Sequence, residues 1–168
     1  MSEEPAPPFR PRVLRVRLRL SPQFRGLLIA VVERTHTAMT HSPAVPQGLT
    51  GDETKPDADL LTAWVEGLQE GNAGDTSVLM KLVRHPEFGE KDLPLSADDA
   101  EAVARAGVRV RLYLRETVLR DLSSAKLEGG TFFYGLPPAE QQTFACYRLL
   151  GHLEEDLLLQ LDPSLAGG

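Results

Sequence analysis

The sequence predicts a mainly α fold: a single-domain helical bundle of about five helices with an N-terminal amphipathic β-strand. Apolar residues recur at helical spacing in several segments, whereas apolar and basic residues alternate strictly in a short segment near the N-terminus. The chain has 168 residues, 42% of them hydrophobic, and this size supports one self-sufficient core. We therefore assign residues 1–12 to a disordered tail, 13–163 to a single mostly helical domain with a long loop at 40–58, and 164–168 to a frayed tail.

The N-terminal strand is predicted over residues 13–20, and its basic face carries Arg15, Arg17 and Arg19. Alternate side chains of a strand lie about 6.8 Å apart, a spacing that phosphate groups could match. The row has no aromatic residues to stack on bases and the chain is acidic overall, so nucleic-acid binding is disfavoured. As an edge strand, the segment could instead accept a peptide strand from a protein partner, or pair with residues 131–134. These three arginines are the candidate partner-contact residues.

Helical spacing and capping residues predict three helices in the first half of the chain. Ser21 followed by Pro22 suits the start of a helix that continues to about residue 39. The next helix ends at Gly71, because glycine suits a helix C-terminus. A third, short helix begins with Asp75 as its cap and ends before the next proline. Residues 85–95 are interpreted as a connection.

Two longer helices are predicted in the second half. Ser96 precedes acidic residues that suit the N-terminal end of a helix, which continues to about residue 122. Pro137 and Pro138 open the last helix, which is rich in leucine and ends before Pro163.

Residues 108–114 are ambiguous, because they also alternate between apolar and polar side chains as a strand does. Two observations favour a helix. Glu101 and Arg105 have the four-residue spacing of a helical ion pair. A second apolar face, which includes Val108 and Leu112, suits a central helix packed on two sides. The strand alternative remains open at this level.

Charge is distributed unevenly along the chain. The first 25 residues hold six arginines and two glutamates, although the whole chain carries a net charge of −6. Either the basic front end pairs with the acidic body inside the fold, or it binds an anionic partner.

Cys146 is the single cysteine, so it cannot form an internal disulfide, and this favours a reducing, cytoplasmic compartment. The longest apolar run, residues 27–32, is far shorter than the roughly 20 residues that span a bilayer. We therefore expect a cytoplasmic protein without a membrane-spanning segment.

Candidate catalytic and metal-binding residues are scattered. Glu33 and His36 have the spacing found in di-iron carboxylate proteins, but the second motif that such a site requires is missing. His152 lies one turn from Glu155 and could act as a base, although a surface ion-pair cluster accounts better for the pattern. Cys146 lies among leucines and is expected to be a buried apolar residue. We assign no catalytic residue, no metal and no cofactor.

Four segments, taken in order, resemble a known family: VRLRLSPQFRGLL, DADLLTAWVEGL, LPLSADDAEAVARAGVRVRLYLRE and YRLLGHLEEDLLLQL. The family is the bacterial domain-of-unknown-function family number two-thousand-and-seventeen. The resemblance implies a mostly helical cytoplasmic fold and no particular activity. It also implies a link to proteolytic quality control, because genes of that family often lie near the adaptor of the Clp protease and near a sulfur-carrier pathway.

The sequence thus favours a non-enzymatic cytoplasmic protein-interaction or regulatory protein, because no known catalytic motif is present. A protein partner is expected, and a homodimer could form through the C-terminal helix, whose consecutive leucines at 157–159 exceed the needs of one apolar stripe. The alternative is an enzyme of unrecognised type with a His/carboxylate site between helices. That alternative requires convergence of Glu33, His36, Glu101, Glu116, His152 and Glu155.

Overall fold

The computed structural model describes residues 12–41, 58–123, 127 and 135–167, with only the backbone described at 40–41 and 58–69. In chain order the elements are β1 (Val13–Val16), α1 (Pro22–His41), α2 (Ala58–Arg84), β2 (Leu93–Ser96), α3 (Ala97–Glu116), α5 (Pro138–Leu161) and the 3₁₀-helix η2 (Pro163–Gly167). The mainly α prediction is therefore confirmed. The predicted tail at 1–12 lies almost wholly outside the described residues, as do the predicted loop at 40–58 and the segment 131–134.

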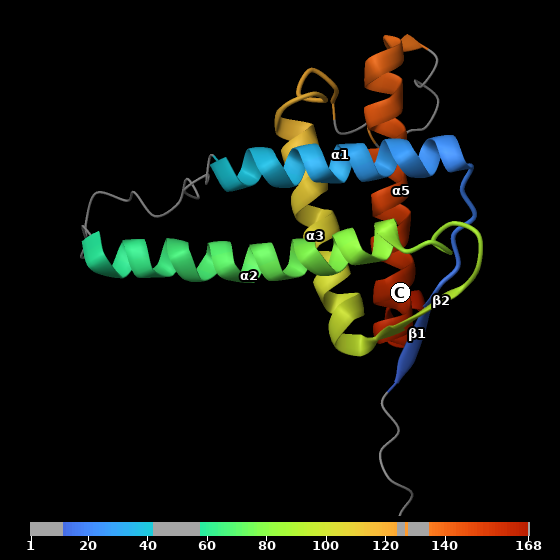
Figure 1. Ribbon diagram of the computed structural model, residues 1–168, viewed down its shortest axis with the longest axis horizontal. Coiled ribbons are helices and arrows are strands. Elements are labelled where there is room, and N and C mark those ends of the chain that lie inside the picture. The colour runs from blue at the N-terminus through green and yellow to red at the C-terminus, as the bar shows by residue number, and fades with distance from the viewer. Residues whose placement is uncertain (1–11, 42–57, 124–126, 128–134, 168) are drawn as a thin grey trace, which may run out of the picture.

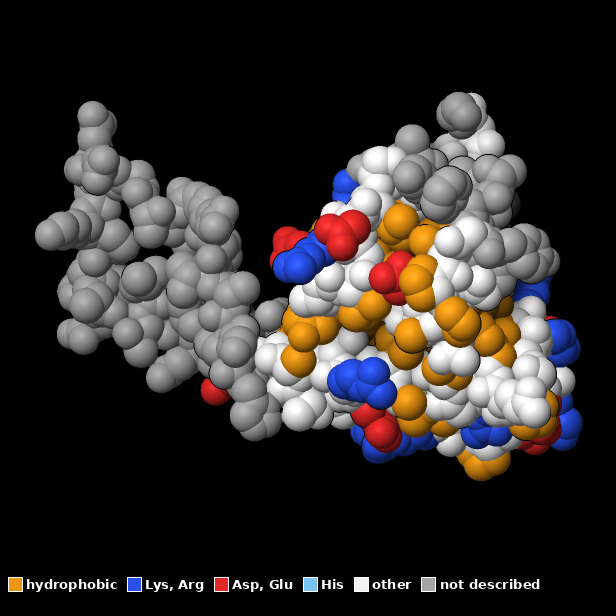
Figure 2. All heavy atoms as spheres, turned by 90° about the horizontal axis from the view of Figure 1, so that it is seen from above, with side chains coloured by type: hydrophobic (Ala, Val, Ile, Leu, Met, Phe, Trp, Pro, Cys, Tyr) orange, Lys and Arg blue, Asp and Glu red, His pale blue; other side chains and the backbone are white. Residues whose placement is uncertain are grey.

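The helices form two crossed pairs (Figure 1). Helices α1 and α2 lie side by side, and both cross α3 and α5, which pack against each other. The core lies between these pairs and includes Leu28, Leu79, Val103 and Leu150, all of them essentially inaccessible to solvent. Seen from above, apolar side chains also gather in the middle of the exposed face, with most charged side chains around them (Figure 2).

Helix α2 corrects the predicted number of helices. Two predicted helices, with a break at Gly71 and a new cap at Asp75, are one continuous helix, so the described part of the chain holds four α-helices. A helical glycine costs about 1 kcal/mol relative to alanine. Burial of Leu79 and Val83 against the other helices outweighs that cost. Asp75 does not cap a helix but faces α3.

The small sheet also differs from the prediction. β1 pairs antiparallel with β2, from Val13 opposite Ser96 to Val16 opposite Leu93, whereas residues 85–95 were expected to be a connection. The predicted strand continued to residue 20, but β1 ends at Val16 because β2 is only four residues long. Beyond the strand, the Leu20 N–H donates to the Gly89 carbonyl at 2.9 Å.

Helix α3 resolves the ambiguity of residues 108–114 in favour of a helix, and it ends at Glu116 rather than near residue 122. Helix α3 packs on two sides as predicted, against α2 and against α5, but Val108 and Leu112 are exposed and do not form the predicted second apolar face. The buried positions of α3 instead form one broad stripe that includes Ala106 and Val110.

The predicted helix starts at Ser21 and Ser96 are confirmed. Ser21 Oγ accepts from the Phe24 N–H at 3.2 Å, and Ser96 Oγ accepts from the Asp99 N–H at 3.1 Å. The last helix begins at Pro138 as predicted, and residues 163–167, most of which were expected to fray, form η2. Across the described residues, no helix combines the length and apolar character needed to cross a membrane.

Candidate functional site

A hollow of about 550 Å³ runs along the outer side of α5, between that helix, α3 and η2. It combines leucine side chains with charged groups. Its lining residues are Arg111, Leu127, Tyr147, Arg148, Gly151, His152, Glu154, Glu155, Leu158, Leu159 and Leu165. Two of these leucines, Leu158 and Leu165, are 44% and 55% exposed. The hollow is therefore an open, partly apolar surface with a charged rim.

One wall of the hollow is a buried ion pair between α3 and α5. Arg111 Nη1 donates to Glu154 Oε2 at 2.8 Å, and the Glu154 side chain is only 7% exposed. The Arg111 guanidinium also lies 4.5 Å from the centre of the Tyr147 ring, a cation–π arrangement. Burial raises the pKa of Glu154, and the hydrogen bond from Arg111 opposes that rise. The ion pair joins α3 to α5, and the positive charge of Arg111 balances the negative charge of Glu154.

Two glycines make room for this pair. A Cβ atom at Gly107 would lie 3.1 Å from Glu154 Cγ, and a Cβ atom at Gly151 would lie 3.1 Å from Arg111 Cζ. The sequence did not predict the Arg111–Glu154 pair or the close approach of α3 and α5 around it. Residues 43 positions apart in the chain leave no local spacing pattern that would indicate a contact. Glycines inside two strongly helical segments were the available sign of close helix contact.

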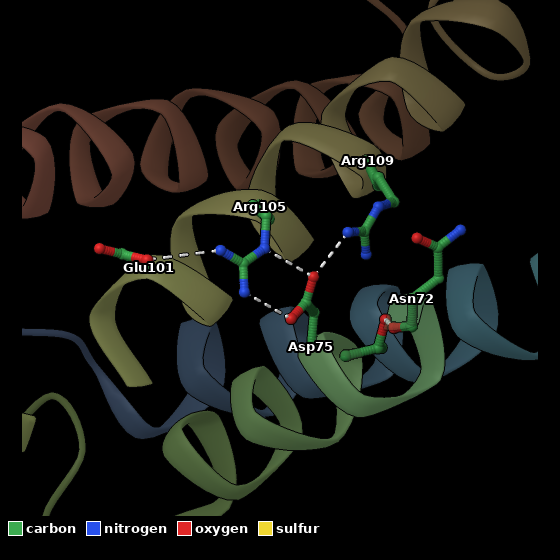
Figure 3. A network of polar contacts seen from close by, with 6 residues as sticks. Asn72, Asp75, Glu101, Arg105 and Arg109 are labelled. Atoms are coloured by element: carbon green, nitrogen blue, oxygen red, sulfur yellow. Dashed lines mark hydrogen bonds and ion pairs between the residues drawn. The ribbon is translucent and has the colours of Figure 1, made fainter. Parts of the chain in front are cut away.

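A second ionic cluster joins α2 to α3 (Figure 3). Asp75 accepts two hydrogen bonds from Arg105, at 2.9 and 3.0 Å, and one from Arg109 at 2.6 Å. The predicted helical pair is confirmed, with Arg105 Nη1 3.7 Å from Glu101 Oε2. The hydrogen bond from Arg105 is the main reason that the pKa of Asp75 lies below its ordinary value. This cluster holds Asp75 ionised and stabilises the α2–α3 contact.

The candidate partner-contact arginines do not form one row on a strand. Arg15 lies within β1, whereas Arg17 and Arg19 follow its end. All three are exposed, and Arg19 pairs with Asp92 at 2.8 Å. One of the three arginines, Arg19, therefore forms an ion pair within the chain.

The outer edge of β1 is covered by a side chain of α5. Gln160 Oε1 accepts from the Arg15 N–H, and Gln160 Nε2 donates to the Arg15 carbonyl, both at 2.9 Å. An amide side chain thus imitates a neighbouring strand at this position. The edge that could have accepted a peptide strand is therefore already occupied at Arg15.

Other arginines of the basic front end contact the rest of the chain. Arg12 Nη1 donates to the Leu161 carbonyl at 3.1 Å, at the C-terminal end of α5. The guanidinium of Arg25 donates to the carbonyls of Arg84, His85 and Pro86, at the end of α2. Cations suit helix C-termini because the terminal carbonyls carry partial negative charge. These contacts and the Arg19–Asp92 pair favour the explanation that the basic front end pairs with the body.

The residues required by the enzyme alternative do not converge in the hollow. Of the six, His152 and Glu155 line it, and the other four do not. Glu33 pairs with Arg84 of α2. Among the described side chains, no three His, Cys, Asp or Glu residues lie close enough together to hold a metal ion.

Cys146 is buried in the core, as predicted. Burial raises the pKa of its thiol to about 12, so the nucleophilic thiolate is scarce at neutral pH.

Comparisons with family models, curated proteins and solved structures find no match to this chain.

Proposed function

We propose that this chain is a non-enzymatic protein-interaction or regulatory protein, and that it binds protein partners through the hollow on α5. The observation that carries the proposal is the exposure of Leu158 and Leu165 beside a charged rim. Apolar side chains gathered in a groove with polar margins are typical of surfaces that accept an amphipathic helix.

The charges around the hollow favour binding over catalysis. Arg111 and Glu154 neutralise each other in a contact that holds two helices together, so neither is positioned to exchange protons with a substrate. The nearby Cys146 thiol is buried and protonated. His152 and Glu155 remain as the titratable rim groups of α5, and both lie on an open surface rather than in an enclosed pocket.

The setting proposed for this binding is the cytoplasm of a bacterium. The single cysteine supports a reducing compartment. The link to proteolytic quality control rests on the resemblance of the four sequence segments alone. A second copy of the chain, docked through the C-terminal helix, is one of the protein partners that we propose.

Site-specific photo-crosslinking in the cells that make the protein tests the proposal. A photoreactive amino acid at Leu159, in the hollow, should give discrete crosslinked protein bands. The same group at Lys81, an exposed position of α2 outside the hollow, serves as the matched control. Leu158→Asp should remove the bands without changing the helical circular dichroism spectrum. The proposal fails if positions 159 and 81 give the same pattern.

A further inference from the structure

Helix α5 gathers acidic side chains at the end where its own dipole disfavours them. From residue 149 to the cap residue at 162, the sequence has four acidic residues and no lysine or arginine. The last carbonyls of a helix carry partial negative charge, so nearby acidic side chains are destabilising and nearby cations are stabilising. This half of α5 therefore favours a positive charge beside it.

Three of the four acidic side chains have partners within the chain. The pairs are Glu154 with Arg111, Asp156 with the Gln160 amide, and Asp162 with Ser164. The fourth, Glu155, is exposed and lines the hollow. Within the described part of the chain, no hydrogen bond or ion pair engages its carboxylate. Glu155 is therefore a negative charge that a partner can reach.

The apolar part of the hollow begins one helical turn beyond Glu155. Leu158 and Leu159 follow it by three and four residues, so all three side chains are neighbours along α5. Leu165 of η2 lines the same hollow. We call these four residues the leucine end of the hollow. It combines exposed apolar side chains with one unpaired carboxylate.

Arginines that line or contact this part of α5 have partners within the chain. They are Arg111, which pairs with Glu154, Arg148, which donates to the Leu127 carbonyl at the opposite end of the hollow, and Arg12, which donates to the Leu161 carbonyl. In the described structure none of them forms an ion pair with Glu155. A cation that pairs with Glu155 must therefore come from another molecule.

We propose that the leucine end binds an amphipathic helix of a protein partner, and that a lysine or arginine of this helix faces Glu155. This inference rests on the proposed function, because it names the kind of partner that the same surface takes. Glu155 lies one turn from its leucines, so the basic residue of the partner is expected three or four residues from an apolar anchor. Its charge also lies beside the C-terminal half of α5, where a cation is favourable.

Selection of helical peptides tests the inference. A displayed library of amphipathic helices of about 16 residues, or roughly four turns, fixes two leucines two turns apart and randomises their neighbours. The full-length chain is the target, and its Leu158→Asp variant is the counter-target. Bound sequences should be enriched in lysine or arginine three or four residues from a leucine.

A charge swap at Glu155 gives a sharper measurement on a selected basic peptide. Glu155→Lys should weaken its binding about fivefold or more, because an attractive contact becomes repulsive. The same variant should strengthen binding of a matched peptide that carries glutamate in place of the basic residue. Fluorescence anisotropy at low salt measures both affinities. Glu70→Lys, at an exposed position of α2 outside the hollow, makes the same change in net charge and should leave both affinities nearly unchanged.

The outcomes separate the two proposals. Selected helices without a basic residue, equal effects of Glu155→Lys and Glu70→Lys, or a library that yields nothing above the Leu158→Asp counter-target each overturn the inference. Discrete crosslinks from position 159 would then leave the proposed function standing, and their absence would overturn both. If light scattering shows a wild-type dimer that Leu158→Asp dissociates, a second copy occupies the leucine end, and only the inference falls.

Discussion

Helix α3 forms ionic contacts on two sides, and the two clusters act in opposite directions on their carboxylates. Toward α5, Glu154 is enclosed with a single arginine, and burial raises its pKa. Toward α2, Asp75 receives hydrogen bonds from two arginines, and its pKa is lowered. The same residue types thus give opposite shifts, because desolvation dominates in one place and hydrogen bonding in the other. A neighbouring arginine therefore does not by itself lower the pKa of a carboxyl group.

Of the variants that test this comparison, removal of the Glu154 carboxylate should lower the free energy of unfolding the most. Glu154→Ala leaves the Arg111 charge in a largely buried site without its carboxylate, and loss of one member of such a pair costs about 3 kcal/mol. Urea unfolding followed by circular dichroism measures the loss. The double variant R111M/E154L removes both charges and should recover most of the stability. A small loss for the single variant would show that Arg111 moves into solvent without penalty.

Asp75→Asn should have a smaller effect, and one that depends on pH. Because the native pKa of Asp75 is below 3.8, its stabilisation is present above that value and is lost as the pH falls through the native pKa. We expect the variant to be less stable by about 1.5 kcal/mol at neutral pH. The difference from wild type should shrink in acid. Unfolding curves over a pH series measure it, and a difference that stays constant in acid would contradict the assignment.

Gly107→Ala should have the smallest net effect. The new methyl group would lie 3.1 Å from Glu154 Cγ, so the α3–α5 contact must adjust. An overpacking cost of about 2 kcal/mol is partly offset by a gain of about 1 kcal/mol in helix propensity. The matched control is Gly74→Ala in α2, where a Cβ atom meets nothing within 4 Å. That control should raise the unfolding midpoint in the same assay, whereas Gly107→Ala should lower it.

Local signals in the sequence predicted the local features of the fold. Ser21, Ser96 and Pro138 mark helix starts because capping depends on residues next to one another in the chain. The continuity of α2 through Gly71 was not predictable in this way, because packing against distant helices determines it. β2 was missed since it contains Pro94, and proline argues against a strand.

In the candidate site too, features set by neighbouring residues could be predicted from the sequence, whereas contacts between distant residues could not. The leucine excess of the last helix was visible in the sequence, and Leu158 is exposed as that excess implied. The Arg111–Glu154 wall joins helices that are far apart in sequence, so no spacing rule could find it. Arg15, Arg17 and Arg19 alternate regularly in the sequence, but they do not share one strand in the structure. The alternation also gave no sign that Arg19 pairs with Asp92.

The contact between Gln160 and Arg15 has a consequence for the solubility of the protein. Exposed N–H and C=O groups at a strand edge can recruit identical edges and start aggregation. Pro94, opposite Arg15 on the inner side of β1, has no N–H to offer, and the Gln160 amide occupies the Arg15 groups from the outer side. The last turns of α5 thus protect the first strand of the chain. Without the Gln160 side chain, the Arg15 N–H and carbonyl would lie at an open strand edge that a second copy of the chain could pair with.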